Sequence, residues 1–348
     1  MPPATDRDHA AALASWPTFT KTLEALLATG QIDPVGCCRT VDDAAVVTLN
    51  GVEYFFEKDD PQLARRVAAL HPHIVQVHGL GFTRLMIAIR RAVGRRVPIL
   101  AQHHGEPPPT ALRSRIGQQV TRRVVDGYLF TGADQAEAFR RAGVISRSTP
   151  VYEVLESASH LDAGAPSDGP KLSGLPSVLW VGRLISSKDP LCAVRAVAAA
   201  RRRHSSAELH MLATDRSMEP EVRQLIESLG LDDVVHLHQA VTHADMPGWY
   251  RRADTYLSTS RREGSNYSLI EALGLGCWPI VTDIPSHAAI VKDLSRRFAV
   301  GDADDAGRLL AAPAGSSRNE VLDHSLRCLS WSSIADQLVG TYRRSQKT

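Results

Sequence analysis

Short apolar runs alternate with stretches of helical periodicity along almost the whole chain. Buried strands separated by helix-length segments are typical of parallel sheets covered by helices. The predicted strands are residues 74–78, 97–101, 124–130, 151–155, 178–181, 208–213, 234–238, 255–258, 279–282 and 298–300. The predicted helices between them include residues 61–70, 80–93, 133–142, 190–202 and 220–229. The pattern therefore predicts an α/β protein.

Two places depart from this alternation. Residues 45–49 and 52–56 flank Asn50-Gly51, a pair that suits the two positive-φ positions of a type I′ turn, so an antiparallel hairpin is expected there. The first fifteen residues contain no apolar strand, although a parallel α/β domain usually opens with one. We therefore expect the first strand of the N-terminal half to be atypical or missing.

The chain has 348 residues, more than a single hydrophobic core usually serves, so two domains are expected. Residues 160–176 are rich in Gly, Pro, Ser and Asp and have no apolar period, which is typical of a linker. A division there leaves two α/β halves of similar size. We place the boundary between residues 165 and 166.

The composition, with 43% hydrophobic and 22% charged residues, excludes collagen-like, coiled-coil and mainly disordered chains. No run of 18 apolar residues is present, and the first sixteen residues are acidic and polar, unlike a secretory signal. A cytoplasmic protein is expected, with peripheral attachment at the inner membrane face as an alternative.

Residues 81–125 concentrate positive charge, with nine arginines against the single acid Glu106. Such a cluster attracts phosphate groups, for example those of an anionic membrane. The alternative is a GC-rich genome, because 34 of the 40 basic residues are arginine. The arginines are Arg84, Arg90, Arg91, Arg95, Arg96, Arg113, Arg115, Arg122 and Arg123.

Several motifs of other enzyme classes are missing from the sequence, including the P-loop, a complete G-x-G-x-x-G, H-E-x-x-H and G-x-S-x-G. The histidines form no helical i, i+4 pair, so no metal site is predicted. Two D-x-D patterns, at residues 6–8 and 302–304, are interpreted as a terminal segment and a helix cap.

Residues 178–190 read as a strand, a glycine, and then the cations Arg183 and Lys188 before a helix. Cations that follow a parallel strand lie at the carboxyl edge of the sheet, where α/β domains bind ligands. An arginine fork beside a lysine suits a diphosphate. The alternative is a surface salt bridge.

Residues 263–271 follow the predicted strand 255–258. Glu263 and Gly264 begin a loop, and Ser265 or Asn266 is expected to cap a helix that carries Glu271. The helix N-terminus offers backbone N–H groups to an anion, and carboxylates accept hydrogen bonds from sugar hydroxyls. The alternatives are that Glu263 caps the loop and that Glu271 pairs with an arginine such as Arg261.

Taken together, G-R-L-x3-K at 182–188, E-x7-E at 263–271 and G-C-x-P-I-V-x-D at 276–283 resemble the retaining glycosyltransferases of family 4. This group 1 family is of the GT-B type. The resemblance implies two Rossmann-like domains, 1–165 on the acceptor side and 166–330 for the nucleotide sugar, with parallel sheets facing an interdomain cleft. It also implies a terminal helix, 331–348, that returns to the first domain.

The resemblance further implies roles for individual residues. Arg183 and Lys188 would hold the diphosphate, Glu271 the ribose, and Glu263 the donor sugar. The segment from Gly264 through Ser265, Asn266 and Tyr267 to Ser268 would reach the phosphates or the sugar. His104 would contact the transferred sugar, with His103 as the alternative if the match is shifted by one residue.

The implied function is metal-independent transfer of a sugar, with retention, from a UDP- or GDP-sugar to an acceptor hydroxyl. The expected acceptor is a glycan or a lipid-linked sugar in polysaccharide, glycolipid or other glycoconjugate biosynthesis. No resident cofactor and no nucleic-acid partner are expected. The family's opening glycine pair has no counterpart in residues 15–21. A non-catalytic nucleotide-sugar-binding subunit is therefore an alternative. An epimerase or phosphorylase on the same fold is another, because fold does not settle function.

Overall fold

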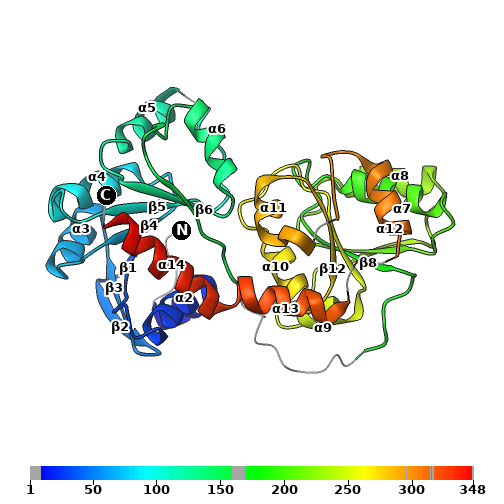
Figure 1. The fold of residues 1–348 in the computed structure, drawn as a ribbon, viewed down its shortest axis with the longest axis horizontal. Helices are drawn as coiled ribbons and strands as arrows, with labels where there is room; N and C mark the ends of the chain where they lie inside the picture. The colour runs from blue at the N-terminus through cyan, green and yellow to red at the C-terminus, as the bar shows by residue number, and fades with distance from the viewer. Residues whose placement is uncertain are drawn as a thin grey trace. The chain divides into compact units, whose positions relative to one another are not determined.

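The computed structural model describes residues 9–110, 112–158, 169–294, 296–313, 315 and 317–346, without the side chains of 112–115 (Figure 1). The chain divides into two compact units. Unit 1 comprises Met1–Glu156 and Trp331–Thr348, and unit 2 comprises Ser157–Ser330. The boundary predicted between residues 165 and 166, and the linker up to residue 168, lie outside the described residues.

Unit 1 contains a parallel sheet in the order β4-β5-β6-β7. Its core is formed by apolar side chains of these strands and of the helices beside them, such as Ile99, Phe130 and Met86. The strands are β4 (Val75–His78), β5 (Ile99–Gln102), β6 (Gly127–Phe130) and β7 (Val151–Glu153). The helices are α3 (Asp60–Ala69), α4 (Thr83–Val93), α5 (Leu112–Thr121), η1 (Ala133–Gln135) and α6 (Ala136–Arg141).

A second sheet of unit 1 has the order β1-β3-β2, with β1 (Val35–Arg39), β2 (Ala45–Leu49) and β3 (Val52–Glu57). The predicted hairpin is confirmed, because β2 and β3 pair antiparallel and both Asn50 and Gly51 have positive φ. The helices α1 (His9–Ala14) and α2 (Pro17–Ala28) precede the first described strand. Strand β1 pairs parallel with β3 and was not predicted from the sequence.

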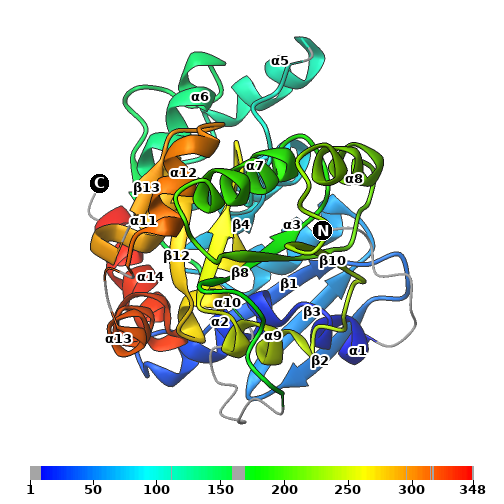
Figure 2. The same cartoon turned by 90° about the vertical axis from the view of Figure 1, so that its right-hand side faces the viewer.

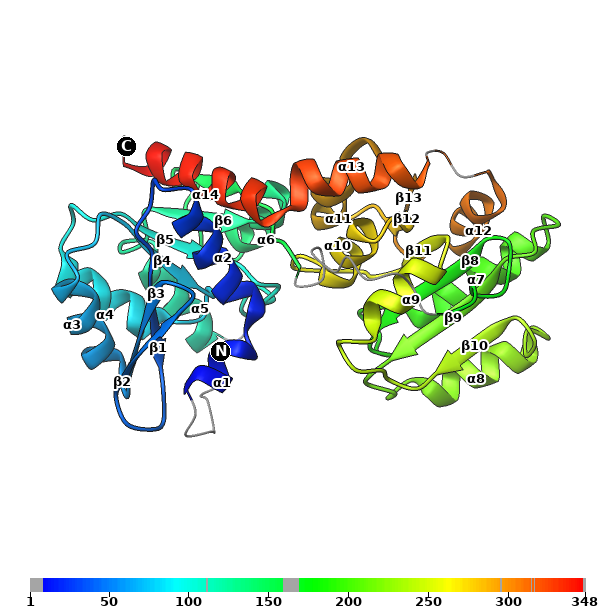
Figure 3. The same ribbon diagram turned by 90° about the horizontal axis from the view of Figure 1, so that it is seen from below.

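The C-terminal helix α14 (Trp331–Ser345) belongs to unit 1 and packs against α2 (Figure 3). Its apolar face is buried, including Ile334 and Leu338. Polar contacts fix it further, since Gln337 accepts a hydrogen bond from the backbone N–H of Leu155 at 3.1 Å. The last turns of the chain therefore complete the unit that its first half begins.

Unit 2 contains an all-parallel sheet in the order β10-β9-β8-β11-β12-β13. The strands are β8 (Ser177–Gly182), β9 (Glu208–Ala213), β10 (Val235–His238), β11 (Thr255–Ser258), β12 (Trp278–Thr282) and β13 (Arg296–Phe298). The helices are α7 (Pro190–Arg201), α8 (Glu219–Ser228), α9 (Met246–Arg252), α10 (Tyr267–Gly274), α11 (Pro285–Val291), η2 (Lys292–Leu294), α12 (Ala303–Ala311) and α13 (Arg318–Leu329).

Helices cover both faces of this sheet, with α7, α8 and α12 on one face and α9 and α13 on the other (Figure 2). Helices α7 and α12 approach closely, because a Cβ on Gly307 would lie 2.4 Å from Cβ of Ala199 and 2.6 Å from the carbonyl oxygen of Ala196. The last predicted strand is corrected from 298–300 to Arg296–Phe298, where the chain pairs with β12 and leaves Val300 exposed. Among the described residues, no helix is both long and apolar enough to cross a membrane.

Candidate active site

The strand order of unit 2 creates a topological switch point. The chain runs from β8 outward through β9 to β10, and then returns to place β11 on the other side of β8. The chain therefore continues from β8 to β9 on one side and from β11 to β12 on the other, and the first loops of these two connections lie next to each other at the carboxyl edge of the sheet. Ligands of open α/β sheets bind at this place. Residues 183–189 and 259–266, which hold most of the predicted site, form these two loops.

Lys188 and Glu263 meet where the two loops face each other. Nζ of Lys188 lies 2.5 Å from Oε1 of Glu263, and the side chains are only 20% and 10% exposed. The hydroxyl of Ser260 donates to the same oxygen at 2.6 Å. Lys188 thus forms a salt bridge, as the alternative expected, but the pair is mostly buried and not on the surface. A shielded pair of this kind interacts more strongly than an exposed one, because water screens it less.

Hydrogen bonds and an ion pair hold the two loops in fixed positions relative to each other. The hydroxyl of Thr259 lies 2.9 Å from the carbonyl oxygens of both Lys188 and Asp189. The backbone N–H of Arg261 donates to the carbonyl oxygen of Ser187, also at 2.9 Å. The Arg261 guanidinium lies 2.7 Å from the carboxylate of Asp189, which itself caps α7. Arg261 therefore does not pair with Glu271, and that alternative is wrong.

Arg183 stands at the start of the first loop, directly after β8, and its side chain is exposed. The neighbouring N–H of Leu184 donates to the carbonyl oxygen of Asp215. Hydrogen bonds from Ser217 lower the pKa of Asp215, and the charge of Arg183 lowers it further. The exposed guanidinium is accessible to an anionic ligand.

Asn266 is the N-cap of α10 and has a left-handed backbone conformation with φ 47°. Its Oδ1 accepts from the backbone N–H of Leu269 at 3.3 Å, as capping requires. Its Nδ2 lies 2.8 Å from Nε2 of His287 and 3.2 Å from Oγ of Ser258. Ser265 and Asn266 are buried, whereas Tyr267 is 40% exposed. The sequence predicted either Ser265 or Asn266 as the helix cap, and the structure shows that Asn266 is the cap.

His287 fixes the orientation of this cap. Its ring is buried, and burial lowers the pKa of His287 to about 4, so the ring is neutral at pH 7. Nδ1 lies 3.0 Å from the carbonyl oxygen of Thr282 and must donate to it. Nε2 is then the acceptor for the amide of Asn266. The N-terminus of α10 is thus held by a buried hydrogen-bond chain that no local sequence pattern indicated.

Glu271 lies on the second turn of α10 with its side chain 8% exposed. The buried hydroxyl of Tyr250 donates to Oε2 at 3.0 Å, and Nε2 of His243 lies 3.7 Å from Oε1. Burial raises the pKa of Glu271, because removal from water disfavours the charged form. Oε1 faces the exposed imidazole of His243, so this oxygen is the one that a ligand hydroxyl can approach.

His104 lies in unit 1 just after β5. Its Nδ1 is 2.9 Å from Oε1 of the buried Glu156, and its Nε2 is 3.1 Å from Nδ1 of His78. Burial lowers the pKa of His104, but the hydrogen bond and charge of Glu156 outweigh that effect and raise it. Burial lowers the pKa of His78 to about 3, so this neighbour is neutral. Glu156 thus orients the imidazole of His104.

His103 points in the other direction. It is buried, it stacks on Phe130 with ring centroids 4.8 Å apart, and its Nε2 lies 3.0 Å from the carbonyl oxygen of Glu106. These contacts place His103 in the core of unit 1. The side chain of His104 is 32% exposed, whereas that of His103 is buried.

The remaining acidic candidates serve local structure. Asp302 caps α12 by accepting from the N–H of Asp305 at 2.9 Å, and Asp304 pairs with Arg202 at 2.8 Å. The other D-x-D pattern, Asp6 to Asp8, lies outside the described residues.

The arginine-rich region divides into two groups. Arg90 is not a surface cation, because its guanidinium donates to the carbonyl oxygens of Gly94, Val97 and Val124 and pairs with Asp126. The exposed arginines among the described side chains are Arg84, Arg91, Arg95, Arg96, Arg122 and Arg123. The side chains of Arg113 and Arg115 lie outside the described residues.

Comparison with known proteins shows which family the residues of unit 2 match. Residues 175–313 match the family model of the glycosyl transferases group 1. The chain is 23% identical over 228 residues to the GDP-mannose:cellobiosyl-diphosphopolyprenol alpha-mannosyltransferase of Xanthomonas campestris, which covers 63% of this chain and 58% of that protein. It is 25% identical over 245 residues to the D-inositol 3-phosphate glycosyltransferase of Arthrobacter sp., covering 66% of this chain and 57% of that protein. The chain thus spans less than three fifths of the length of these curated relatives.

Solved structures share the fold over nearly the whole chain. The structure described as trehalose-6-phosphate from E. coli bound with UDP-2-fluoro glucose superposes with a TM-score of 0.67. The match covers 93% of this chain and 95% of that one at 13% identity, so it bears on the fold alone. Residues 175–313 of unit 2 therefore match the group 1 glycosyl transferases, and the two α/β units, each with a parallel sheet, have the GT-B fold.

Proposed function

We propose that the chain is a retaining glycosyltransferase that moves a sugar from a UDP- or GDP-sugar to an acceptor hydroxyl without a divalent ion. The observation that carries this proposal is the Lys188–Glu263 pair at the switch point of unit 2, beside the Asn266-capped N-terminus of α10. This arrangement offers cations for a diphosphate and carboxylates for hydroxyls within one fixed pair of loops. The family match over the same residues supports it.

The cations address the main electrostatic demand of the reaction. As the glycosidic bond breaks, negative charge grows on the departing diphosphate. In the proposed role, Arg183 and Lys188 stabilise this charge, and a preorganised donor of this kind is worth about 2.7–4 kcal/mol in other enzymes. Lys188 is preorganised because Glu263 and the backbone contacts of Thr259 hold its loop.

The carboxylates are proposed to recognise the two hydroxyl-bearing parts of the donor. Glu271 would accept from the ribose hydroxyls through Oε1, since Tyr250 already occupies Oε2. Glu263 would accept from hydroxyls of the transferred sugar. The segment 264–268 at the start of α10 would supply backbone N–H groups to the phosphates, assisted by the positive end of the helix dipole.

His104 is proposed to contact the transferred sugar near its anomeric carbon. Glu156 orients its ring through the 2.9 Å contact at Nδ1. A hydrogen bond that strengthens as positive charge develops on the sugar ring lowers the barrier more than it aids donor binding. His104→Ala should therefore reduce turnover about 10²-fold, equivalent to about 3 kcal/mol, with donor affinity little changed.

The acceptor is proposed to be a glycan or a lipid-linked sugar in glycoconjugate biosynthesis. One similar protein is named for a diphosphopolyprenol-linked acceptor. We propose that anionic lipid contacts unit 1 through exposed side chains, among them Arg84, Arg91 and Arg122 and the apolar Ile116 and Val120. Flotation with anionic against neutral vesicles tests this contact, and equal recovery with both would contradict it.

The proposal is tested by titrating a panel of nucleotide sugars and assaying transfer with NMR detection of the product anomer. Lys188→Ala should weaken donor binding and reduce turnover. Lys171→Ala is the matched control, because Lys171 also forms an ion pair in unit 2, with Asp254 at 2.6 Å. Donor binding without turnover on any acceptor would favour the non-catalytic subunit. Inversion at the anomeric carbon would refute the retaining mechanism.

A further inference from the structure

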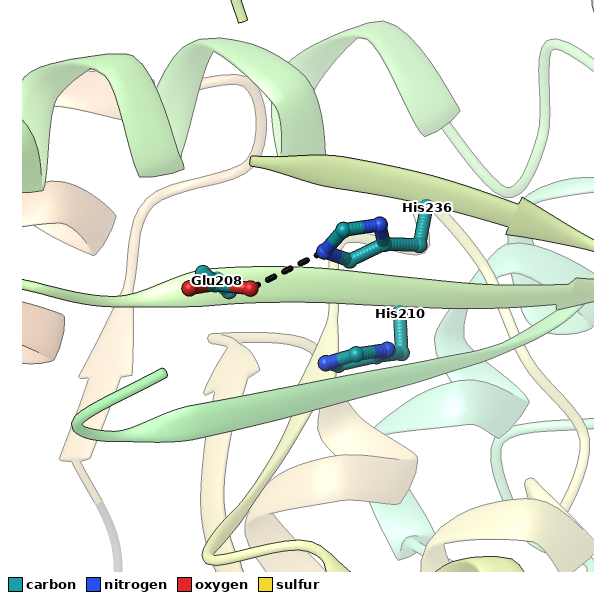
Figure 4. A group of neighbouring side chains, drawn as sticks. All are labelled: Glu208, His210 and His236. Atoms are coloured by element: carbon teal, nitrogen blue, oxygen red, sulfur yellow. Dashed lines mark hydrogen bonds and ion pairs between the residues drawn. The ribbon is translucent and has the colours of Figure 1, made fainter. Parts of the chain in front are cut away.

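A second group of polar side chains lies on β9 and on its neighbour β10, the edge strand of the sheet, away from the residues discussed above. Side chains two residues apart on a strand share a face, so Glu208 and His210 project from the same side of β9. His236 of β10 stands directly opposite His210 in the parallel register. Figure 4 shows the three side chains gathered together, with His236 turned toward the carboxylate of Glu208.

The three residues converge at their polar ends. One ligand atom from each lies within 4.8 Å of the other two. Nε2 of His236 lies 2.9 Å from Oε2 of Glu208, and the rings of His210 and His236 stack with centroids 4.7 Å apart. Ser173 Oγ lies 2.5 Å from Oε2 of Glu208 and 3.4 Å from Nε2 of His210. The Nε2 atoms of His210 and His236 therefore both lie on the side of the Glu208 carboxylate.

We propose that Glu208, His210 and His236 bind one divalent transition-metal ion of the zinc class. Two imidazole nitrogens and one carboxylate oxygen form a donor set that zinc uses in proteins, with a further position for water. Hard cations such as Mg²⁺ prefer oxygen ligands alone, so this set discriminates against them. Nε2 of His210 also lies 3.1 Å from the carbonyl oxygen of Ser173, so the ion would replace two hydrogens, that of the His236–Glu208 contact and that of the His210–Ser173 contact.

The surroundings supply what a metal site needs beyond its ligands. Nδ1 of His210 lies 3.1 Å from Nε2 of His238, so the far side of the ligand ring has a partner that orients it. His210 is buried and held in place, whereas the side chains of His236 and Glu208 are 31% and 25% exposed. An ion can therefore enter from solvent and meet one fixed and two adjustable ligands.

The position of the group indicates a structural role. Glu208 is the first residue of β9 and His236 the second of β10, so both lie at the amino edge of the sheet. Lys188 and Glu263 follow the carboxyl ends of their strands. A bound ion would join the edge strand β10 to β9 and leave the residues proposed for the nucleotide sugar untouched, so the inference is independent of the proposed function.

The test is zinc binding by the untagged full chain after chelation and dialysis, followed by isothermal titration calorimetry. We expect one Zn²⁺ per chain and much weaker binding of Mg²⁺. His236→Gln should weaken Zn²⁺ binding about 100-fold or more, beyond the about 10–100-fold effect of residues outside the ligand set. His73→Gln is the matched control, since His73 is an exposed histidine outside the group.

Thermal unfolding gives an independent readout. Zn²⁺ should raise the unfolding temperature of the wild type and of His73→Gln but not of His236→Gln, because an ion that binds only the folded state stabilises it. Circular dichroism confirms that each variant is folded. Absence of stoichiometric Zn²⁺ binding, or equal binding by His236→Gln and the wild type, would overturn the proposal.

Discussion

Replacing Glu271 tests the proposed nucleotide site, because two substitutions separate its structural role from its binding role. Glu271→Ala removes the acceptor of the buried Tyr250 hydroxyl, which lies 3.0 Å from Oε2. A buried donor left without a partner costs about 1–3 kcal/mol. In a unit of this size each kcal/mol shifts the unfolding temperature by about 2–4 °C, so a fall of about 2–12 °C is expected.

Glu271→Gln keeps an oxygen acceptor for Tyr250 and removes only the charge. Burial raises the pKa of Glu271, which means that the fold disfavours its ionised form. The glutamine variant should therefore unfold at the same temperature as the wild type or higher. Hydrogen bonds to a charged acceptor exceed neutral ones by about 1–2 kcal/mol, so the dissociation constant should rise about 5–30-fold.

Calorimetry with free nucleoside diphosphate and with the nucleotide sugar provides the decisive comparison. Because the ribose is common to both ligands, Glu271→Gln should weaken both by the same factor. Glu221→Gln, an exposed residue of α8, is the control and should change neither. Unchanged affinity for both ligands, or a loss confined to the nucleotide sugar, would refute the assignment of Glu271 to the ribose.

Three other predictions concern different parts of the chain. Glu263→Gln should weaken the nucleotide sugar more than the free nucleotide in the same calorimetric assay, because both ligands lose the pairing that holds Lys188 but only the nucleotide sugar loses a contact to its sugar. Equal losses would contradict the assignment of Glu263 to the donor sugar. The hydrogen bond and charge of Glu156 raise the pKa of His104 by more than burial lowers it. Protonated His104 therefore contributes its full stabilisation of the fold below the unfolded pKa of about 6.5, and this contribution is lost as pH rises through the folded pKa. The unfolding-temperature difference between wild type and His104→Gln should shrink as pH rises, and NMR titration should show a lower pKa for His104 in Glu156→Gln. Gly307→Val should lower the free energy of unfolding of unit 2 by about 1–3 kcal/mol in urea, because even a Cβ at this position would lie 2.6 Å from a backbone oxygen of α7. An unchanged urea midpoint would show that α7 and α12 can separate to make room.

The sequence by itself determined the elements whose signals are local. The apolar runs at 208–213 and 255–258 coincide with β9 and β11, and Asn50-Gly51 produced the predicted hairpin. The signals for these features are carried by neighbouring residues, since an apolar run marks a buried strand and two permissive residues mark a tight turn. The resemblance to the group 1 family could also be seen in the sequence, because the spacing of its motifs is read along the chain, and residues 175–313 match the family model.

Only the tertiary structure decided which distant residues meet. Strand β1 lacks a strong apolar pattern and forms because Gly36 leaves room for the ring of Tyr54, whose Cδ1 would lie 2.3 Å from a Cβ there. The Lys188–Glu263 pair joins loops 75 residues apart, and it exists because β11 returns to lie beside β8. The Glu208, His210 and His236 group likewise arises from the register of β9 against β10. Strand order and register follow from how the whole core packs, and a one-residue shift in register would separate these side chains.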